Sequence, residues 1–151
     1  MHSTLIVLND LLLFACVSMY FGTGWSLVLF SIPPKKTVDN YYDQIIPQLA
    51  LATAFLTPMT GVMCVTGAVM TVSEWHHRVW APVIVLVAVI AATLLTGLGI
   101  FPLNRLLATR IRDPALLETT LSRWKLLSYV RLGFWSVEWL AMAVYIGLAL
   151  G

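Results

Sequence analysis

The chain has 151 residues, of which 60% are hydrophobic and 11% are charged. Soluble domains carry roughly 25% charged residues, so this composition excludes an ordinary soluble domain and favours an integral membrane protein. The formal net charge of +2 is too small to characterise a partner by itself.

Four apolar segments are long enough to cross a bilayer, whose hydrocarbon core needs about 20 mostly apolar residues per helix. They cover about residues 4–32, 44–73, 79–104 and 124–150. The first is expected to be retained rather than cleaved, because no Lys or Arg precedes it and Asp10 interrupts it. Short connections leave no room for a soluble domain. We therefore predict one all-α domain over residues 1–151, an integral membrane four-helix bundle.

The third connection is expected to contain a short helix of its own. Asp113-Pro114 is a typical helix start, and the apolar residues Leu116, Leu117 and Leu121 follow it at helical spacing. This pattern predicts a short amphipathic helix lying on the membrane interface between the third and fourth segments.

Basic residues indicate the orientation of the bundle. The first and third connections, with their flanks, hold seven of the nine Lys and Arg residues. Because cytoplasmic loops are enriched in Lys and Arg, we expect these connections in the cytoplasm, with both termini and the second connection outside, in a bacterial inner membrane. Acidic residues are mixed into the third connection, which favours membrane lipid headgroups over nucleic acid as a partner. The seven residues are Lys35, Lys36, Arg105, Arg110, Arg112, Arg123 and Lys125.

Each of the first three segments carries small or polar residues on one helical face, at spacings of mostly three and four. Such faces let membrane helices approach closely, or they line a cavity, and both interpretations stay open. The residues are Asn9, Cys16, Tyr20 and Thr23 in the first segment, Thr53, Thr57, Thr60, Cys64, Gly67 and Thr71 in the second, and Thr93, Gly97, Ile100 and Asn104 in the third.

The fourth segment carries two charges on one face. Charged side chains inside a membrane helix are costly, so they normally face protein or water and have partners. Arg131 and Glu138 are about 10.5 Å apart along a helix axis, which predicts a third group between or beside them. The face comprises Trp124, Ser128, Arg131, Trp135, Glu138, Met142 and Tyr145.

Asp10 is the expected counter-charge, because it enters from the same end as Glu138 and reaches a comparable depth. Asn104 and either Tyr20 or Trp25 are expected nearer Arg131. Two carboxylates against one guanidinium would leave a negative charge, so we expect one carboxyl to carry a proton. A proton carrier, a hydrogen-bond donor and acceptor for a substrate, and a purely structural polar clasp are all consistent with this group.

Histidines supply a second candidate site. Glu74, His76 and His77 belong to the second connection, and His2 is expected on the same side. Imidazole suits zinc, copper or iron, but adjacent histidines do not share a helix face, so ordinary interfacial residues are the favoured interpretation and no metal site is predicted. The sequence requires no cofactor, and it contains no nucleotide-binding loop or nucleophile triad.

The C-terminal half resembles a known family. The run Phe101-Pro102-Leu103-Asn104-Arg105-Leu106, a charged connection, Trp124 and then Arg131 resemble the small four-helix membrane proteins related to anthrone oxygenases. The resemblance implies signature roles for Asn104, Trp124 and Arg131. It also implies oxidation of polycyclic aromatic substrates without an obvious bound cofactor. Tyr129 departs from the pattern, because an asparagine is common there.

Together these features predict an oxygenase-like membrane enzyme acting on a hydrophobic, anthrone- or quinol-like substrate. The alternatives are a non-catalytic subunit of a larger membrane complex, with an interior filled by side chains, and a proton-coupled carrier that would need to form a homo-oligomer. The predicted catalytic residues are Arg131, Glu138, Asp10 and Asn104, and the predicted substrate contacts are Trp124, Trp135, Tyr20 and Tyr129.

Overall fold

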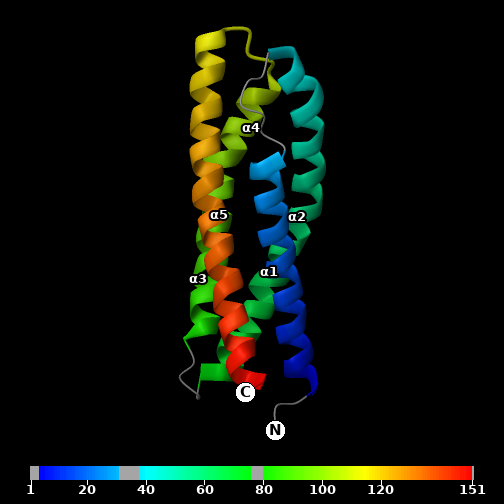
Figure 1. Cartoon of the computed structure of the whole chain (residues 1–151), viewed down its shortest axis with the longest axis vertical. Helices are drawn as coiled ribbons and strands as arrows, with labels where there is room; N and C mark the ends of the chain where they lie inside the picture. The colour runs from blue at the N-terminus through cyan, green and yellow to red at the C-terminus, as the bar shows by residue number, and fades with distance from the viewer. Residues whose placement is uncertain (1–3, 31–37, 76–79, 151) are drawn as a thin grey trace.

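The computed structural model describes residues 4–30, 38–75 and 80–150, nearly all of which are helical. Three consecutive helical elements, together called the third rod, follow one another without a break over residues 81–108. The chain therefore forms four long helical rods (Figure 1). This confirms the predicted all-α, four-helix class. The elements are α1 (Thr4–Phe30), α2 (Val38–Glu74), α3 (Ala81–Leu95), the π-helical turn η2 (Thr96–Ile100), α4 (Phe101–Ala108) and α5 (Pro114–Leu150).

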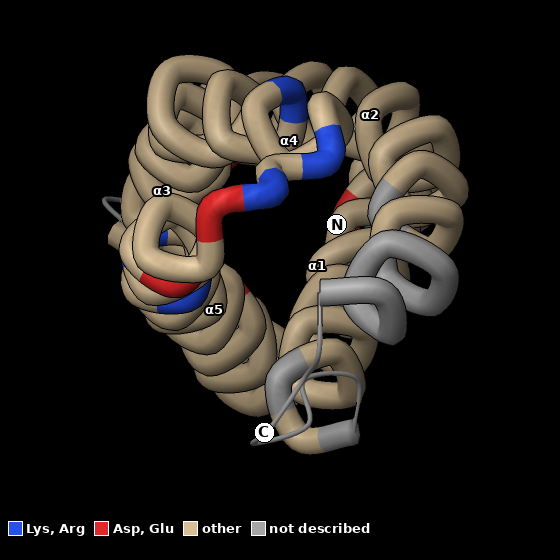
Figure 2. Tube along the Cα trace, turned by 90° about the horizontal axis from the view of Figure 1, so that it is seen from above, with Lys and Arg blue, Asp and Glu red and all other residues tan. Residues whose placement is uncertain are grey.

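The four rods form a closed ring. Neighbouring pairs in contact are α1 with α2, α2 with α3, α3 with α5, and α5 with α1. Figure 1 shows both termini at the same end as the link between α2 and α3, whereas α4 and the start of α5 lie at the opposite end. This up-and-down arrangement agrees with the predicted placement of both termini on one side. From above, Figure 2 shows basic residues of α4 and of its connection to α5 gathered at the opposite end.

The boundaries of the last two rods differ from the prediction. The third rod continues to Ala108, and α5 begins at Pro114, so the separate interfacial helix predicted between them is wrong. Asp113 accepts the backbone N–H of Ala115 at 3.0 Å and so caps α5 directly. Leu117, which was expected on the membrane surface, is buried against Trp124. Residues 114–123 are therefore the first turns of α5, and they pack inward rather than on the membrane surface.

One turn of the third rod is π-helical, which was not predicted from the sequence. In η2 the chain is wound more widely, and the N–H of Phe101 bonds to the carbonyl of Thr96, five residues earlier. Pro102 follows at once and has no N–H to continue the α-helical pattern. Gly97 and Gly99 lie within the same turn. The proline with its two nearby glycines was the available signal.

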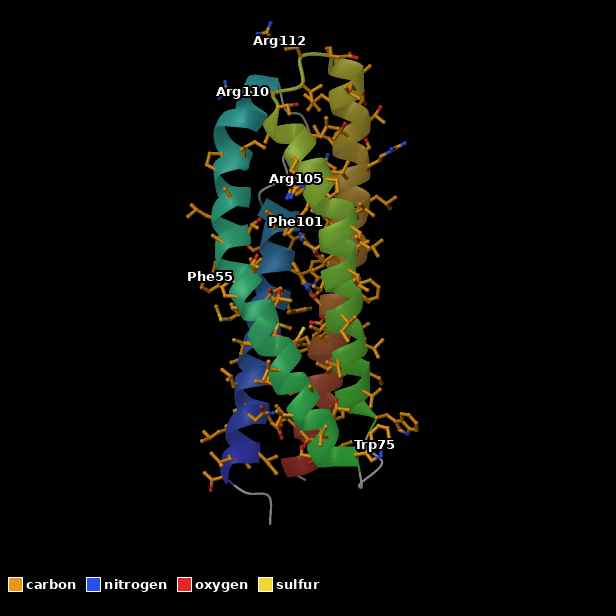
Figure 3. The ribbon with its side chains drawn as sticks, turned by 180° about the vertical axis from the view of Figure 1, so that it is seen from behind. Phe55, Trp75, Phe101, Arg105, Arg110 and Arg112 are labelled. Carbon is orange, nitrogen blue, oxygen red and sulfur yellow. The ribbon has the colours of Figure 1, made fainter. Side chains whose placement is uncertain are left out.

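The outer surface of the bundle is apolar. Leu5, Leu51, Val72 and Leu98 are 73–78% exposed, and Phe55 projects outward (Figure 3). Three stretches of the described chain are long and apolar enough to cross a membrane. The fourth predicted segment, 124–150, is not among these three. The stretches are Thr4–Leu27, Ile46–Glu74 and Ala81–Ala108.

Candidate functional site

A cavity of about 450 Å³ lies inside the bundle, and all four rods line it. Small-molecule sites have volumes of roughly 300–1,000 Å³, so this cavity is large enough for a ligand of several rings. Its lining is mainly apolar, with aromatic groups from three rods and threonine hydroxyls from α1, α2, α3 and η2. The aromatic residues are Tyr20, Phe101, Trp124 and Trp135.

The polar faces predicted for the first three segments form much of this lining. Thr53, Thr57, Thr60 and Cys64 contribute from α2, whereas Gly67 and Thr71, further along the same face, do not. Of the two interpretations left open by the sequence, a lined cavity is therefore correct for this part of the bundle. The third rod contributes Thr93, Gly97, Ile100 and Asn104, and α1 contributes Tyr20 and Thr23.

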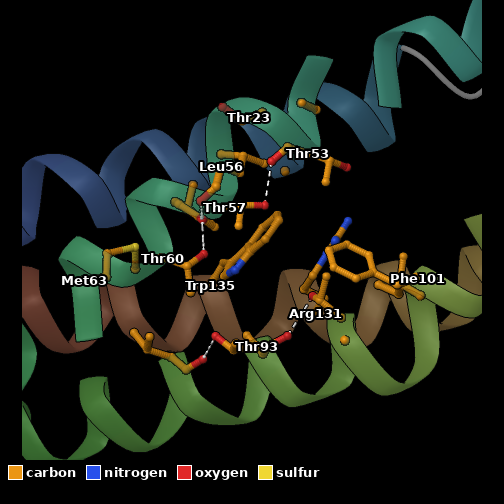
Figure 4. A pocket seen from close by; sticks show the side chains of 18 of the residues that line it. Thr23, Thr53, Leu56, Thr57, Thr60, Met63, Thr93, Phe101, Arg131 and Trp135 are labelled. Carbon is orange, nitrogen blue, oxygen red and sulfur yellow. Dashed lines mark hydrogen bonds between the residues drawn. The ribbon is translucent and has the colours of Figure 1, made fainter. Parts of the chain in front are cut away.

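The predicted face of α5 points inward. Trp124, Trp135 and Glu138 are 2%, 5% and 0% exposed, and with Arg131 they line the cavity. The group found beside Arg131 is Trp135 rather than the expected Asp10. Its ring centroid lies 4.6 Å from the Arg131 guanidinium carbon, a cation–π arrangement, and its other neighbour is Tyr20, edge-on at 5.0 Å. Figure 4 shows Arg131 and Trp135 extending from α5 into the cavity.

Both ionisable groups retain unused hydrogen-bonding capacity. The two carboxyl oxygens of Glu138 and Nε of Arg131 are all buried. Within the described residues, none of these three atoms has a hydrogen-bond partner. A buried polar group without a partner is destabilising, so such groups are rare in folded proteins. Their position on the cavity wall makes them available to a ligand.

The structure corrects the placement of Asp10. This residue does not line the cavity, and its carboxylate accepts hydrogen bonds from the Tyr145 hydroxyl and the Asn9 amide, each at 3.3 Å. Tyr145 is two turns beyond Glu138, about 10.5 Å along α5. Leu13 and Met142, both 0% exposed, occupy the level between the two carboxyls in the apolar core. Asp10 therefore belongs to a separate polar group near the termini.

Tyr129 is also misplaced in the prediction. It is 54% exposed and does not line the cavity. Its neighbour Ser128 is 4% exposed, and each helical residue turns the side-chain direction by about 100°, so Tyr129 faces the outer surface. A substrate contact inside the bundle is therefore excluded for this residue.

Asn104 and Trp124 both line the cavity and are hydrogen-bonded to each other. The indole N–H of Trp124 donates to Oδ1 of Asn104 at 2.8 Å, which ties the end of the third rod to α5. The sequence placed both residues at the site but did not reveal this bond.

The candidate metal site cannot be assembled from what the structure describes. His2, His76 and His77 lie outside the described residues, and Glu74 is buried near the termini, away from the cavity lining. Among the described residues, no three His, Cys, Asp or Glu side chains are grouped to hold a metal ion.

The fold and the cavity define the class: an all-helical four-rod bundle with a mainly apolar internal cavity and two ionisable groups on its wall. Comparisons with protein-family models, with curated proteins and with solved structures find no match to the chain. The resemblance to anthrone oxygenases therefore stays a prediction.

Proposed function

We propose that the chain is an integral membrane protein in which α5 is a fourth span beside the three apolar stretches. The exposed leucines and valines on the outer surface support this, because a soluble monomer rarely presents so much contiguous apolar surface. Trp75 and Trp80, 68% and 73% exposed, flank the link between α2 and α3, where interfacial tryptophans are expected. We place the basic end of the bundle in the cytoplasm of a bacterial cell, following the distribution of Lys and Arg.

The cavity is proposed to bind a hydrophobic aromatic molecule taken from the bilayer. Trp124, Trp135 and Tyr20 offer ring faces and edges to such a molecule, and the lining is mainly apolar. The single observation that carries the proposal is that Arg131 and Glu138 open onto one apolar cavity with unpartnered buried atoms. A bundle that served only as a packing subunit is expected to fill this space with side chains.

The proposed reaction is oxygenase-like and uses these two groups on an anthrone-like substrate. The Glu138 carboxylate takes a proton from the substrate CH₂ group, and the Arg131 guanidinium stabilises the resulting enolate oxygen. Dioxygen adds to the carbanion, and the proton returns to the peroxide that forms. Loss of water then leaves a carbonyl, so that CH₂ and O₂ become C=O and H₂O.

Oxygen uptake by the purified protein with anthrones as substrates tests this proposal. We expect Arg131→Ala and Glu138→Gln to lower the rate by about 100-fold or more, the usual effect of losing electrostatic or general-base catalysis. Arg123→Ala and Glu118→Gln are matched controls, because both residues lie exposed on α5 and should leave the rate unchanged. Equal rates for wild type and Arg131→Ala would refute the proposed reaction.

A further inference from the structure

Three threonine hydroxyls in the cavity already donate their hydrogen within their own helix. Thr57, Thr93 and Thr96 each donate to the backbone carbonyl four residues earlier in their own helix, at 2.7 Å. This is the usual length of a good O–H···O bond. A hydroxyl has one hydrogen and two acceptor lone pairs, so these three groups, the acceptor threonines, offer the cavity lone pairs only. They lie on both α2 and the third rod, so the acceptors occupy two walls.

Donors line the same cavity. The indole N–H of Trp124 can only donate, so Asn104 must turn its oxygen toward that group and its NH₂ elsewhere. Asn104 itself lines the cavity, as does Arg131, whose guanidinium carries five N–H donors and accepts nothing. Both donors lie nearer than Glu138 to the end that holds α4, since α5 runs from that end through Trp124 to Arg131 and then Glu138.

Glu138 adds to the acceptor side. Its carboxyl is 0% exposed, lines the cavity and has no hydrogen-bond partner in the described part of the chain. A carboxyl group offers at least one acceptor oxygen whether or not it carries a proton. The cavity therefore pairs a donor region at Asn104 and Arg131 with acceptors at Glu138 and the acceptor threonines.

We propose that this arrangement selects a polyhydroxylated aromatic ring in its reduced form, such as a quinol, over the corresponding oxidised quinone. One substrate oxygen accepts from Arg131 and Asn104, and the other hydroxyls donate to the acceptor threonines or to Glu138. The inference rests on the proposed function, since it names the substrate class for the same cavity.

Oxidation reverses this match. When C–OH becomes C=O, a ring donor becomes an acceptor, and it then faces the lone pairs of the acceptor threonines. A threonine that turned its hydrogen toward the quinone would give up its bond to the helix carbonyl, so no hydrogen bond would be gained. The quinone is therefore bound more weakly than the quinol.

Equilibrium dialysis of the full-length protein in lipid nanodiscs, without oxygen, tests the inference. The probes are 1,4-naphthohydroquinone, 1,4-naphthoquinone and naphthalene, which share one ring system. A single hydrogen bond changes affinity by about fivefold, so two should make the quinol bind at least about tenfold more tightly than the quinone.

Single substitutions identify the residues responsible for the preference for quinol over quinone. Thr57→Val and Thr93→Val each remove one acceptor with little change in volume, so each should lower the quinol-to-quinone affinity ratio by about fivefold. Thr93→Ser keeps the hydroxyl and should keep the ratio. Thr71→Val is the matched control, because Thr71 makes the same bond within α2, to Gly67 at 2.8 Å, but does not line the cavity.

The outcomes separate the two proposals. Saturable binding of quinol and quinone with equal affinity overturns the inference and leaves a cavity for aromatic molecules. An unchanged affinity ratio in both valine variants also overturns it. Saturable binding of none of the three probes, naphthalene included, overturns the proposed function as well.

Discussion

Gly24 of α1 lies against side chains of α5, where there is no room for a methyl group. A Cβ atom built on Gly24 would lie 2.6 Å from Cε3 of Trp135 and 2.9 Å from Cδ1 of Leu132. Ordinary van der Waals contact begins at 3.4 Å, so the shortfall to the indole is about 0.8 Å. Gly22, two residues earlier on the same helix, would meet nothing within 4 Å.

Gly24→Ala is therefore expected to destabilise the bundle. The indole of Trp135 cannot simply move away, because Tyr20 and the Arg131 guanidinium flank it. Overpacking of this kind costs about 1–3 kcal/mol. At about 2–4 °C per kcal/mol for a chain of this size, thermal unfolding in detergent should shift down by roughly 2–12 °C. Gly22→Ala should raise the midpoint slightly, since alanine is favoured over glycine in a helix by about 0.5–1 kcal/mol.

A double variant identifies the contact responsible. Replacing Trp135 by leucine removes the ring that the new methyl group meets, so Gly24→Ala should cost at least about 1 kcal/mol less in a Trp135→Leu background. Far-UV circular dichroism during heating measures the unfolding midpoints of the wild type and of each variant. If Gly24→Ala unfolds at or above the wild-type temperature, as Gly22→Ala should, the close packing of α1 on α5 described above is incorrect.

Three further predictions use the same unfolding measurement. Trp124→Phe removes the only N–H that the indole offers Asn104 and should cost about 1–3 kcal/mol, whereas an unchanged midpoint would mean that the bond contributes nothing. Asp113→Ala removes the cap of α5 and should cost about 0.5–2 kcal/mol, with faster amide exchange confined to the first turns of that helix. Glu138→Met replaces an unpartnered buried carboxyl by an apolar side chain and should stabilise the bundle by about 1–3 kcal/mol while abolishing oxygen uptake. A lower midpoint for Glu138→Met would instead identify this residue as a structural clasp.

The inward faces of the helices were predictable because helical periodicity is a local property of the sequence. Spacings of three and four placed Trp124, Arg131, Trp135 and Glu138 on one face of α5, and the structure places all four on the cavity. The same rule, applied strictly, excludes Tyr129, which follows the inward Ser128 by a single residue. The resemblance had already marked this residue as a departure from the family pattern, in which an asparagine is common there.

The start of α5 was missed because an apolar stripe looks alike on a membrane surface and against a protein core. Leu117 and Leu121 pack on Trp124 and the end of the third rod, and only those neighbours distinguish the two cases. The π-helical turn depends similarly on how Pro102 is accommodated between packed helices.

Composition and periodicity alone determined the helical class, the apolar exterior and the polar faces that turn inward, because each of these is set by residues a few positions apart. Tertiary structure decided at which level those faces meet, because the axial register of two helices depends on contacts such as Gly24 against Trp135. In that register, the Tyr145 hydroxyl donates a hydrogen bond to Asp10, and Glu138 lies on the wall of the cavity. Counting residues from the helix ends placed the two carboxyls together, whereas packing of Leu13 and Met142 between them keeps them apart.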